Sequence, residues 1–198
     1  MFILLFIAVW QYSLHVFKRS ELYFWRFLFG AMGMFGLIVV VLFPVLTEPL
    51  SRSVAALAGI FGRMTDWCTT YFRYGIIFIE AKRDTLSLMI DMECSGIIEI
   101  SVFVSLITFF DVYRTYEKVI VAIIGFLTIE LANAFRIILI ASITHFFGMS
   151  SYYVAHTFIG RIFFYFCSIV LYFYIFTKPQ IIRMKVGNIV YGNHKPNA

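Results

Sequence analysis

The sequence predicts an all-α polytopic membrane protein, with about five transmembrane helices and a small extracytoplasmic amphipathic helix and β-hairpin. Composition is the first observation, because 62% of the residues are hydrophobic and only 14% are charged, whereas soluble domains are about half apolar and a quarter charged. A chain of 198 residues cannot bury that much apolar surface in one core, so lipid must cover the rest. The other two observations are a series of long apolar runs and one stretch in which every second residue is apolar.

Five apolar segments approach the length of about 20 residues that a spanning helix needs. We expect these helices at residues 1–17, 22–46, 94–110, 119–147 and 156–176. The first run has no basic residues before it and no small-residue cleavage site after it. We therefore interpret it as a retained helix and not as a signal peptide. The sequence shows no internal repeat, and we treat residues 1–198 as a single membrane domain.

Basic residues in the connections predict the orientation of these helices, because cytoplasmic loops are enriched in Lys and Arg. If the helices alternate in direction, three basic groups share one side: Lys18 and Arg19, Arg114 and Lys118, and Lys178, Arg183 and Lys185. The opposite connection, 148–155, contains no Lys or Arg. We expect a multi-pass protein of the cell membrane with an extracytoplasmic N-terminus and a cytoplasmic C-terminus. Residues 187–198 are expected to form a flexible cytoplasmic tail.

The long connection 47–93 is predicted to be extracytoplasmic and to contain two elements. Residues 50–67 have apolar side chains at helical spacing, in a run too short to span a bilayer. We interpret them as an amphipathic helix on the outer membrane surface, with Trp67 as an interfacial anchor. Residues 85–92 alternate with a period of two, and they are expected to pair with 71–80 across the polar turn 81–84. The second strand would then lead directly to Cys94.

The formal net charge of +5 has a simple explanation in membrane topology, so we expect no nucleic-acid partner. The basic residues lie beside the apolar runs, where they orient the chain in the bilayer. The three cysteines, Cys68, Cys94 and Cys167, form no C-x-x-C pair. The sequence therefore predicts no metal site and no redox motif.

Cys94 is a candidate nucleophile because it stands where a strand ends and an apolar helix begins. The free backbone N–H groups and the positive dipole of a helix N-terminus favour a thiolate. Two alternatives remain open at this point. Cys94 is a buried structural cysteine, or it forms a disulfide with Cys68 in an oxidising compartment.

Arg136 is a second candidate, because an arginine near the centre of a membrane helix costs about 2.5–3.5 kcal/mol on insertion scales. Asn133 lies one turn away on the same face. Arg136 falls toward the outer end of its helix, from which its guanidinium can reach the outer surface. The alternative is an ion pair with Glu130 or Glu99 that only holds helices together.

His156 begins the last predicted helix, just after an extracytoplasmic loop, and alone it fits an ordinary interfacial histidine. The combination is more informative, because the predicted topology places Cys94, Arg136 and His156 at the outer ends of three different helices. A thiolate, an imidazole and a guanidinium are a nucleophile, a proton carrier and an oxyanion stabiliser.

These motifs, in this order, resemble the exosortase/archaeosortase family of membrane-embedded cysteine transpeptidases. The resemblance covers roughly residues 84–176, which include Cys94-Ser95-Gly96, Asn133-x-x-Arg136 in an apolar helix, and His156 at the head of the last helix. The chain is similar to the compact, exosortase-G-like branch. The resemblance implies that Cys94 is the nucleophile, that Arg136 and His156 complete the catalytic set, and that residues 94–176 form the catalytic core helices, with Asn133, Ser95 and Gly96 in support.

The resemblance also implies the reaction and the partner. The substrate would be a membrane-anchored protein with a C-terminal sorting signal, namely a short motif, a transmembrane helix and a basic cytoplasmic end. Cleavage would form a thioester acyl-enzyme without any cofactor. Two rival functions stay open: an intramembrane cysteine protease that uses water as the acceptor, and a non-enzymatic membrane protein such as a transporter or assembly subunit.

Overall fold

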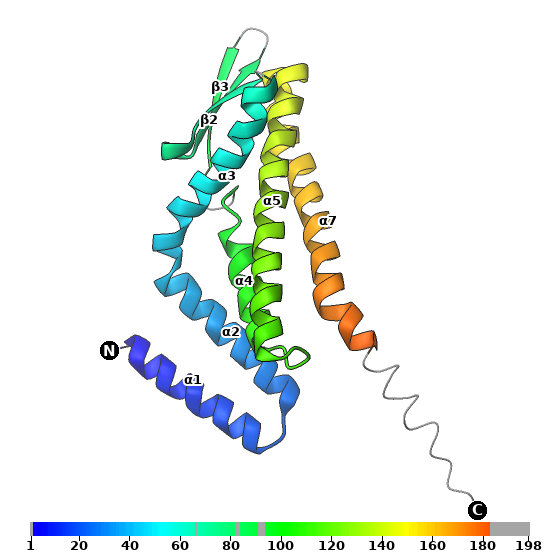
Figure 1. The fold of residues 1–198 in the computed structure, drawn as a ribbon. Helices are drawn as coiled ribbons and strands as arrows, with labels where there is room; N and C mark the ends of the chain where they lie inside the picture. Colours follow the sequence, from blue (N-terminus) through cyan, green and yellow to red (C-terminus); the bar gives the residue numbers. More distant parts are fainter. Residues whose placement is uncertain (1, 66, 82–83, 91–93, 183–198) are drawn as a thin grey trace, which may run out of the picture.

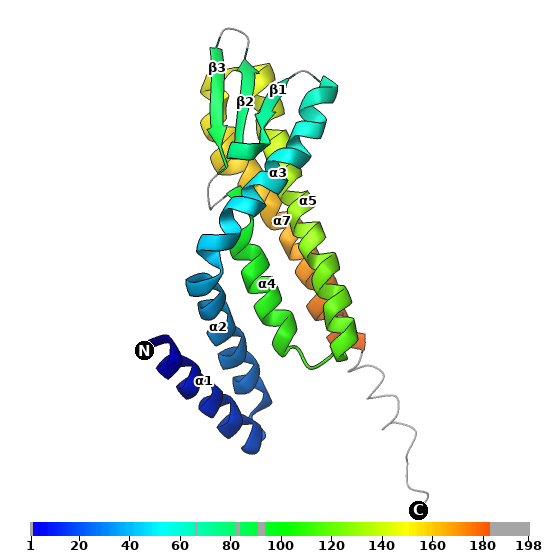
Figure 2. The same ribbon diagram turned by 60° about the vertical axis from the view of Figure 1, so that its left-hand side comes forward.

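A computed structural model describes residues 2–65, 67–81, 84–90 and 94–182. Long helices run side by side through most of the molecule, and a small sheet lies at one end of them (Figures 1 and 2). The helix pair α1 (Phe2–Arg19) and α2 (Tyr23–Val41) lies toward the opposite end. Some positions discussed above lie outside the described residues: Lys82 and Arg83 of the predicted turn, the basic residues Arg183 and Lys185, and the predicted tail 187–198.

Small residues allow α2 to pack closely against its neighbours. A Cβ at Gly33 would collide with the indole of Trp10 on α1, and one at Gly30 would collide with the ring of Phe109. The Trp10 indole nitrogen donates a hydrogen bond to the carbonyl of Phe29 at 3.0 Å. In a lipid environment helices associate through such close van der Waals contact, which small residues permit.

The helix that follows corrects one expectation from the sequence. We expected a span over 22–46 and a separate surface helix over 50–67, but α2 ends at Val41 and α3 runs from Phe43 to Thr65. Its apolar face is not turned to lipid, because Val54, Ala55 and Ala58 are fully buried in the protein core. This helix packs on the sheet and on α5.

Trp67, which the sequence predicts as an interfacial anchor, packs against the end of α5. Its indole stacks on His145, with 5.5 Å between the ring centroids, and meets the edge of Phe146 at 4.8 Å. It therefore ties the end of α3 to the end of α5, with Phe61 packed against it at 5.7 Å.

The predicted hairpin is present as β2 (Ile76–Ala81) and β3 (Asp84–Met89), paired antiparallel with Ala81 opposite Asp84. A third strand that the sequence did not predict, β1 (Cys68–Tyr71), pairs with the other edge of β2, and the short 3-10 helix η1 (Phe72–Tyr74) connects them. Ile77 and Ile79 of β2 are fully buried. They pack into the core that α3 and α5 share with the sheet.

The remaining helices are α4 (Ile97–Phe109), α5 (Thr115–Phe147) and a long rod over Met149–Ile182. The rod consists of η3 (Met149–Ser151), α6 (Tyr152–Val154), the π-helix η4 (Ala155–Ile159), α7 (Gly160–Tyr172) and a second π-helix, η5 (Phe173–Thr177). Packing in this half of the molecule centres on four buried side chains: Phe103, Ile129, Phe164 and Leu171.

Among the described residues, three helices are long and apolar enough to cross a membrane: Tyr23–Val41, Thr115–Phe147 and Met149–Ile182. The shorter α4 is apolar but has 13 residues. The prediction of about five spans therefore stays a prediction for α1 and α4. At 1.5 Å per residue α5 is about 50 Å long, whereas the hydrocarbon layer is about 30 Å thick. One end of α5 therefore has to project from the bilayer.

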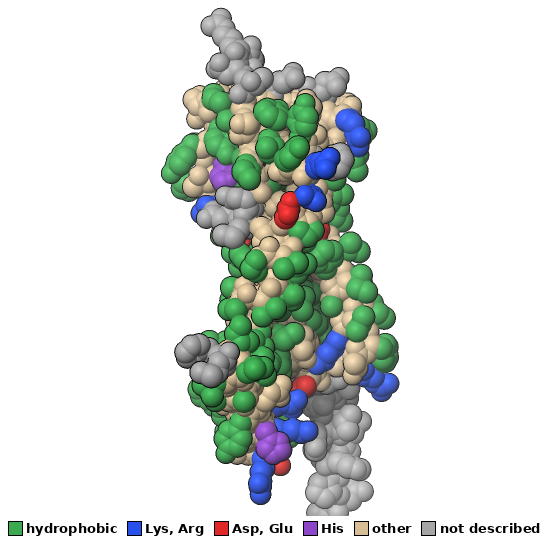
Figure 3. Space-filling model, turned by 90° about the vertical axis from the view of Figure 1, so that its left-hand side faces the viewer, with side chains coloured by type: hydrophobic (Ala, Val, Ile, Leu, Met, Phe, Trp, Pro, Cys, Tyr) green, Lys and Arg blue, Asp and Glu red, His purple; other side chains and the backbone are tan. Residues whose placement is uncertain are grey.

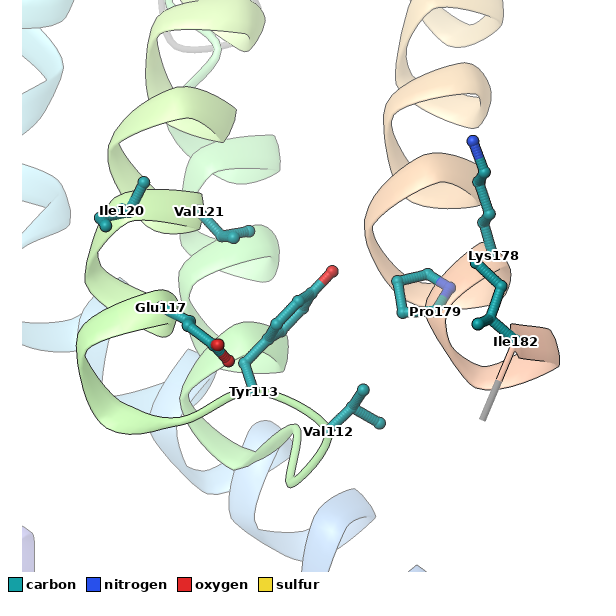
Figure 4. Close-up of a pocket in the computed structure, with 8 residues that line it drawn as sticks. All are labelled: Val112, Tyr113, Glu117, Ile120, Val121, Lys178, Pro179 and Ile182. Atoms are coloured by element: carbon teal, nitrogen blue, oxygen red, sulfur yellow. The ribbon is translucent and has the colours of Figure 1, made fainter. Parts of the chain in front are cut away.

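Lys and Arg side chains gather near both ends of the molecule, including the end of the bundle away from the sheet (Figure 3). Arg26 forms an ion pair with Asp111 there at 3.8 Å. A pocket of about 470 Å³ lies at this end, between the start of α5 and the end of the last helix (Figure 4). Beside it, the Tyr113 hydroxyl donates a hydrogen bond to the carbonyl of Ile175 at 2.7 Å. This hydrogen bond joins the start of α5 to the last helix at the end opposite the sheet.

Candidate functional site

Three segments far apart in the sequence bring Cys94, Arg136 and His156 together. Cys94 precedes α4, Arg136 lies in α5, and His156 lies in the π-helix η4. The Cys94 Sγ lies 3.4 Å from His156 Nε2 and 3.7 Å from Arg136 Nη2. The convergence that the sequence predicted for these three side chains is therefore present in the structure.

The local setting of Cys94 differs in one respect from the prediction. The helix α4 begins at Ile97, so Cys94 lies in a short turn before the helix and not in its first turn. Gly96 is the N-cap and has a left-handed φ of 72°, a conformation that suits glycine. The Ser95 hydroxyl accepts a long hydrogen bond of 3.4 Å from the Ile97 N–H. Cys94 and Ser95 are both buried.

Asn133 holds this turn against α5. Its side-chain nitrogen donates a hydrogen bond to the backbone carbonyl of Cys94 at 2.5 Å, and the residue is fully buried. A Cβ at Gly96 would lie 3.3 Å from the same Asn133 nitrogen. Asn133 therefore fixes the turn that carries Cys94 against α5.

Arg136 is buried, with 4% of the residue exposed. Its Cζ lies 5.9 Å from the centre of the Phe164 ring on α7. Arg136 also lines a pocket of about 320 Å³ with Glu99 and Arg161. The sequence-based alternative named Glu130 or Glu99 as an ion-pair partner. Glu130 accepts a hydrogen bond of 2.7 Å from the Ser53 hydroxyl of α3.

His156 is half-buried, and its ring stacks on Tyr152 with 5.5 Å between centroids and 27° between planes. The π-helix inserts one extra residue per turn, which rotates the side chains of this segment relative to an α-helix. Gly160 follows one turn later, where a Cβ would lie 2.9 Å from Ile140 Cδ1 on α5. The rod therefore approaches α5 closely just below His156.

Several neighbours of the site were missed or used only lightly in the sequence analysis. Tyr152 precedes His156 by four residues, a spacing that brings two side chains together on a helix. Glu99 and Arg161 are charged residues in apolar runs, and such residues mark functional positions in membranes. These signals were present in the sequence, but nothing in the sequence indicated the π-helix.

The other two cysteines do not share the surroundings of Cys94. Cys68 and Cys167 are free thiols, so no Cys68–Cys94 disulfide forms. Burial raises the pKa of the Cys68 thiol, which keeps it protonated and unreactive at neutral pH. No group of three or more His, Cys, Asp or Glu side chains within the described ranges is arranged to hold a metal ion.

A thiol between an imidazole and a guanidinium is a chemically specific arrangement. The imidazole can take up and return a proton, and the cation favours the thiolate and stabilises negative charge on an attacked carbonyl. A nucleophile paired with a histidine recurs in acyl-transfer enzymes on unrelated folds. The geometry therefore fits nucleophilic acyl transfer.

Comparison with known proteins gives one clear result. A family model described as transmembrane exosortase matches residues 1–173. A search of curated proteins and a search of solved structures find no match. The matched region includes every residue of the Cys94 site, and it covers most of the 198 residues. The chain belongs to the transmembrane exosortase family.

Proposed function

We propose that this exosortase-family protein is a cysteine transpeptidase that cleaves the C-terminal sorting signal of a membrane-anchored substrate protein. One observation carries the proposal: the Cys94 Sγ has His156 Nε2 at 3.4 Å and Arg136 Nη2 at 3.7 Å. Nucleophile, proton carrier and oxyanion stabiliser are thus within reach of one another before any substrate binds. Residues 94–176 would form the catalytic core around them.

In the first step, the Cys94 thiolate attacks the scissile carbonyl carbon and forms a C–S bond. The carbonyl oxygen gains negative charge, and the Arg136 guanidinium stabilises it through its fork of N–H donors. The protonated imidazole of His156 then gives its proton to the leaving amine as the C–N bond breaks. A thioester on Cys94 and a released C-terminal peptide result.

In the second step, an acceptor attacks the thioester carbonyl. His156, now neutral, takes the proton from the acceptor as the new bond forms, and the C–S bond breaks to return the Cys94 thiolate. An amine acceptor gives an amide and completes a transpeptidation, whereas water gives a free carboxylate. Asn133, Ser95 and Gly96 would act in support by fixing the turn that carries Cys94.

We place the site at the outer face of the cell membrane. Lys18 and Arg19 lie in the last turn of α1, Arg114 is the N-cap of α5, and Lys118 lies in its first turn. These helix ends are away from the sheet, as expected for a cytoplasmic side. Arg136 lies about 32 Å along α5 from Thr115 at 1.5 Å per residue. This distance is close to the thickness of the hydrocarbon layer, which supports a position of Arg136 at the outer boundary and of segment 47–93 outside.

The two rival functions make different use of the same residues. A hydrolytic protease would share the acylation step and differ only in the acceptor. A non-enzymatic transporter or assembly subunit would need no reactive thiol. Against the latter, the polar residues Cys94, Asn133, Arg136 and His156 gather at one level, and transporter sites usually lie near the bilayer midplane.

Product analysis separates these functions. Purified protein in proteoliposomes would be incubated with a substrate that carries a C-terminal transmembrane helix, with and without a primary amine. Mass spectrometry of the new C-terminus should show an amide to the added amine. A free carboxylate at every amine concentration would indicate a protease, and an uncleaved substrate together with an inert Cys94 would favour the non-enzymatic rival.

A further inference from the structure

The strand β3 forms one edge of the small sheet and ends close to the candidate nucleophile. The strand order is β1-β2-β3, and within the ranges that the structure describes no strand pairs with the outer edge of β3. In Figure 2 its arrow points toward the helices. Leu88 of β3 belongs to the same buried cluster as Cys94, and so does Ile90, which follows the strand. A chain that lies along this edge is therefore led to the Cys94 site.

The pairing with β2 determines which backbone groups of β3 face its outer edge. The Ile90 N–H donates a hydrogen bond to the Gly75 carbonyl at 2.8 Å, so Ile90 directs its backbone toward the β2 side. Along an antiparallel strand, residues that bond to the partner alternate with residues that point away from it. The residues whose N–H and C=O groups point to the outer edge are therefore Thr85, Ser87 and Met89.

The outer edge of β3 lacks the features that usually prevent a sheet edge from pairing. Proteins protect such edges with charged side chains, proline, bulges or a covering element. After Asp84 at its start, β3 contains no charged residue and no proline, and its register with β2 has no bulge. The opposite edge strand, β1, has four residues and packs against α3. Of the two edges, that of β3 is the one suited to another extended chain.

The proposed substrate has to present such a chain at Cys94. A peptide carbonyl inside a helix already accepts a hydrogen bond, so the attacked bond has to lie in an extended stretch before the substrate helix. The N–H and C=O groups of that stretch need partners, because unsatisfied groups are costly where water is scarce. A sheet edge provides these partners independently of the side chains. The substrate runs from the outside into the membrane, which is also the direction of β3.

We propose that the segment just before the substrate's transmembrane helix adds to the outer edge of β3 as a parallel strand, and that this pairing places the scissile bond at Cys94. The inference rests on the proposed function and adds how the substrate backbone is recognised. Thr85, Ser87 and Met89 supply the backbone donors and acceptors. The side chains of Ser87 and Met89 are exposed, and they would contact alternate side chains on one face of the added strand.

Disulfide crosslinking tests the pairing without any need for catalysis. The enzyme background carries Cys94→Ala, Cys68→Ser and Cys167→Ser, and a single cysteine is added on β3 as Ser87→Cys or Met89→Cys. The probe is a single-span protein with an uncharged extracytoplasmic segment before a Leu-rich helix of about 20 residues. One cysteine is moved along the segment that precedes the probe's helix.

The other edge of the sheet provides matched controls. Thr69→Cys on β1 lies at the level of Ser87, because both residues are opposite Phe78. Tyr71→Cys lies at the level of Met89, because both are opposite Ile76. These four side chains are exposed. The two β1 positions are about 10 Å farther from the added strand, beyond the reach of a disulfide.

We expect crosslinks from the β3 positions at least about tenfold above their β1 controls, at every second position of the probe segment. The best probe position should move by two residues toward the probe's helix when the enzyme cysteine moves from Ser87 to Met89. Yields without alternation, a shift away from the helix, or equal yields from β1 would overturn strand addition.

The outcomes for strand addition and for the proposed function are separable. Processing that depends on Cys94 without this crosslink pattern would leave the proposed function standing and reject strand addition. The crosslink pattern without Cys94-dependent processing would remove the function and keep the strand site.

A proline tests whether the backbone is what β3 contributes. Ser87→Pro removes an N–H that points to the outer edge, so the pairing with β2 is kept, and edge strands tolerate proline at such positions. In the Met89→Cys enzyme it should lower the crosslink yield about three- to tenfold relative to Ser87→Ala, as expected for one lost hydrogen bond. Thermal unfolding of both variants checks the fold. Equal yields in the two variants would reject backbone recognition, and the register of the proline-free crosslinks decides the docking site independently.

Discussion

Asn133 donates a hydrogen bond of 2.5 Å to the backbone carbonyl of Cys94, and this contact joins the turn that carries the thiol to the helix that carries Arg136. Arg136 follows Asn133 by three residues on α5, so one helix face positions both the backbone and the Sγ of Cys94. The separation between thiol and guanidinium therefore depends on the contacts that the Cys94 turn makes with one helix, α5.

Substitution of Asn133 should impair catalysis through this contact. Asn133→Ala removes the hydrogen bond from the side chain of residue 133 to the buried Cys94 carbonyl, at a cost of about 1–3 kcal/mol. Asn133→Asp has the same shape but cannot donate when ionised, so it should be at least as poor. We expect kcat for substrate cleavage to fall about tenfold or more in both variants. Thr128→Ala, on the same helix and bonded only to the Ile124 carbonyl, should keep wild-type kcat. An Asn133→Asp variant with unchanged kcat would contradict the positioning role.

Arg136 should be sensitive even to a conservative change. Arg136→Gln removes the cation near the thiol, and we expect kcat to fall about 100- to 1000-fold, as when an oxyanion donor is lost. Arg136→Lys should also be severely impaired, because a point charge cannot replace a planar fork of donors.

Alkylation of Cys94 by iodoacetamide at neutral pH gives an independent readout of the thiolate. It should be slower in Arg136→Gln than in the wild type, because a nearby opposite charge favours the ionised form. Arg63→Gln, an exposed change on α3, serves as the control for loss of a positive charge. Full activity in Arg136→Lys would leave Arg136 with a structural role only.

Gly96 and Gly148 both have a positive φ, of 72° and 85°, but their ψ angles differ: Gly96 is left-handed with ψ of 6°, and Gly148 has ψ of −179°. Alanine costs about 1–2 kcal/mol in the conformation of Gly96 and about 1–3 kcal/mol in that of Gly148, which is essentially restricted to glycine, so both Gly→Ala variants should lose stability in thermal unfolding. A Cβ at Gly96 would also press on the Asn133 nitrogen at 3.3 Å, whereas one at Gly148 meets nothing within 4 Å. Only Gly96→Ala should therefore lower kcat. Equal kcat losses in the two variants would show that strain alone, and not the contact with Asn133, explains the effect.

The orientation in the membrane is open to direct labelling. Thr69→Cys on β1 and Thr115→Cys at the start of α5 both replace exposed residues, in a background that lacks the native cysteines. A membrane-impermeant maleimide added to intact cells should label position 69 and miss position 115, while lysed cells label both. The reverse pattern would put the Cys94 site on the cytoplasmic side and remove access to an exported substrate.

Much of this architecture follows from local sequence patterns. Two-residue alternation indicated β3 and its partner, and apolar length indicated α2, α5 and the last helix. The candidate site could be predicted because Cys94, Arg136 and His156 are residue types that are uncommon within or beside an apolar membrane segment. An arginine in an apolar run is costly, and a thiol and an imidazole at predicted outer ends can meet there.

Other features depend on tertiary contacts that no local pattern encodes. The strand β1 has four residues, too few to show a period, and it exists because β2 offers an edge. The amphipathic pattern of residues 50–67 correctly predicted a helix. Such a pattern fits burial of the apolar face against lipid or against protein equally well, and Val54 and Ala58 pack against protein. The π-helix at His156 has no sequence signal, because one inserted residue changes only the local twist.

The central claim is that Cys94 carries the acyl group, and the most direct test is to trap it. Substrate and enzyme would be mixed briefly in proteoliposomes, quenched in acid and digested, and the Cys94 peptide would be analysed by mass spectrometry. We expect an adduct of the substrate's upstream fragment on Cys94 that hydroxylamine releases, and that persists in the Cys68→Ser, Cys167→Ser double variant. Processing that continues in Cys94→Ala, or an adduct on another residue, would contradict the role of Cys94 as the nucleophile.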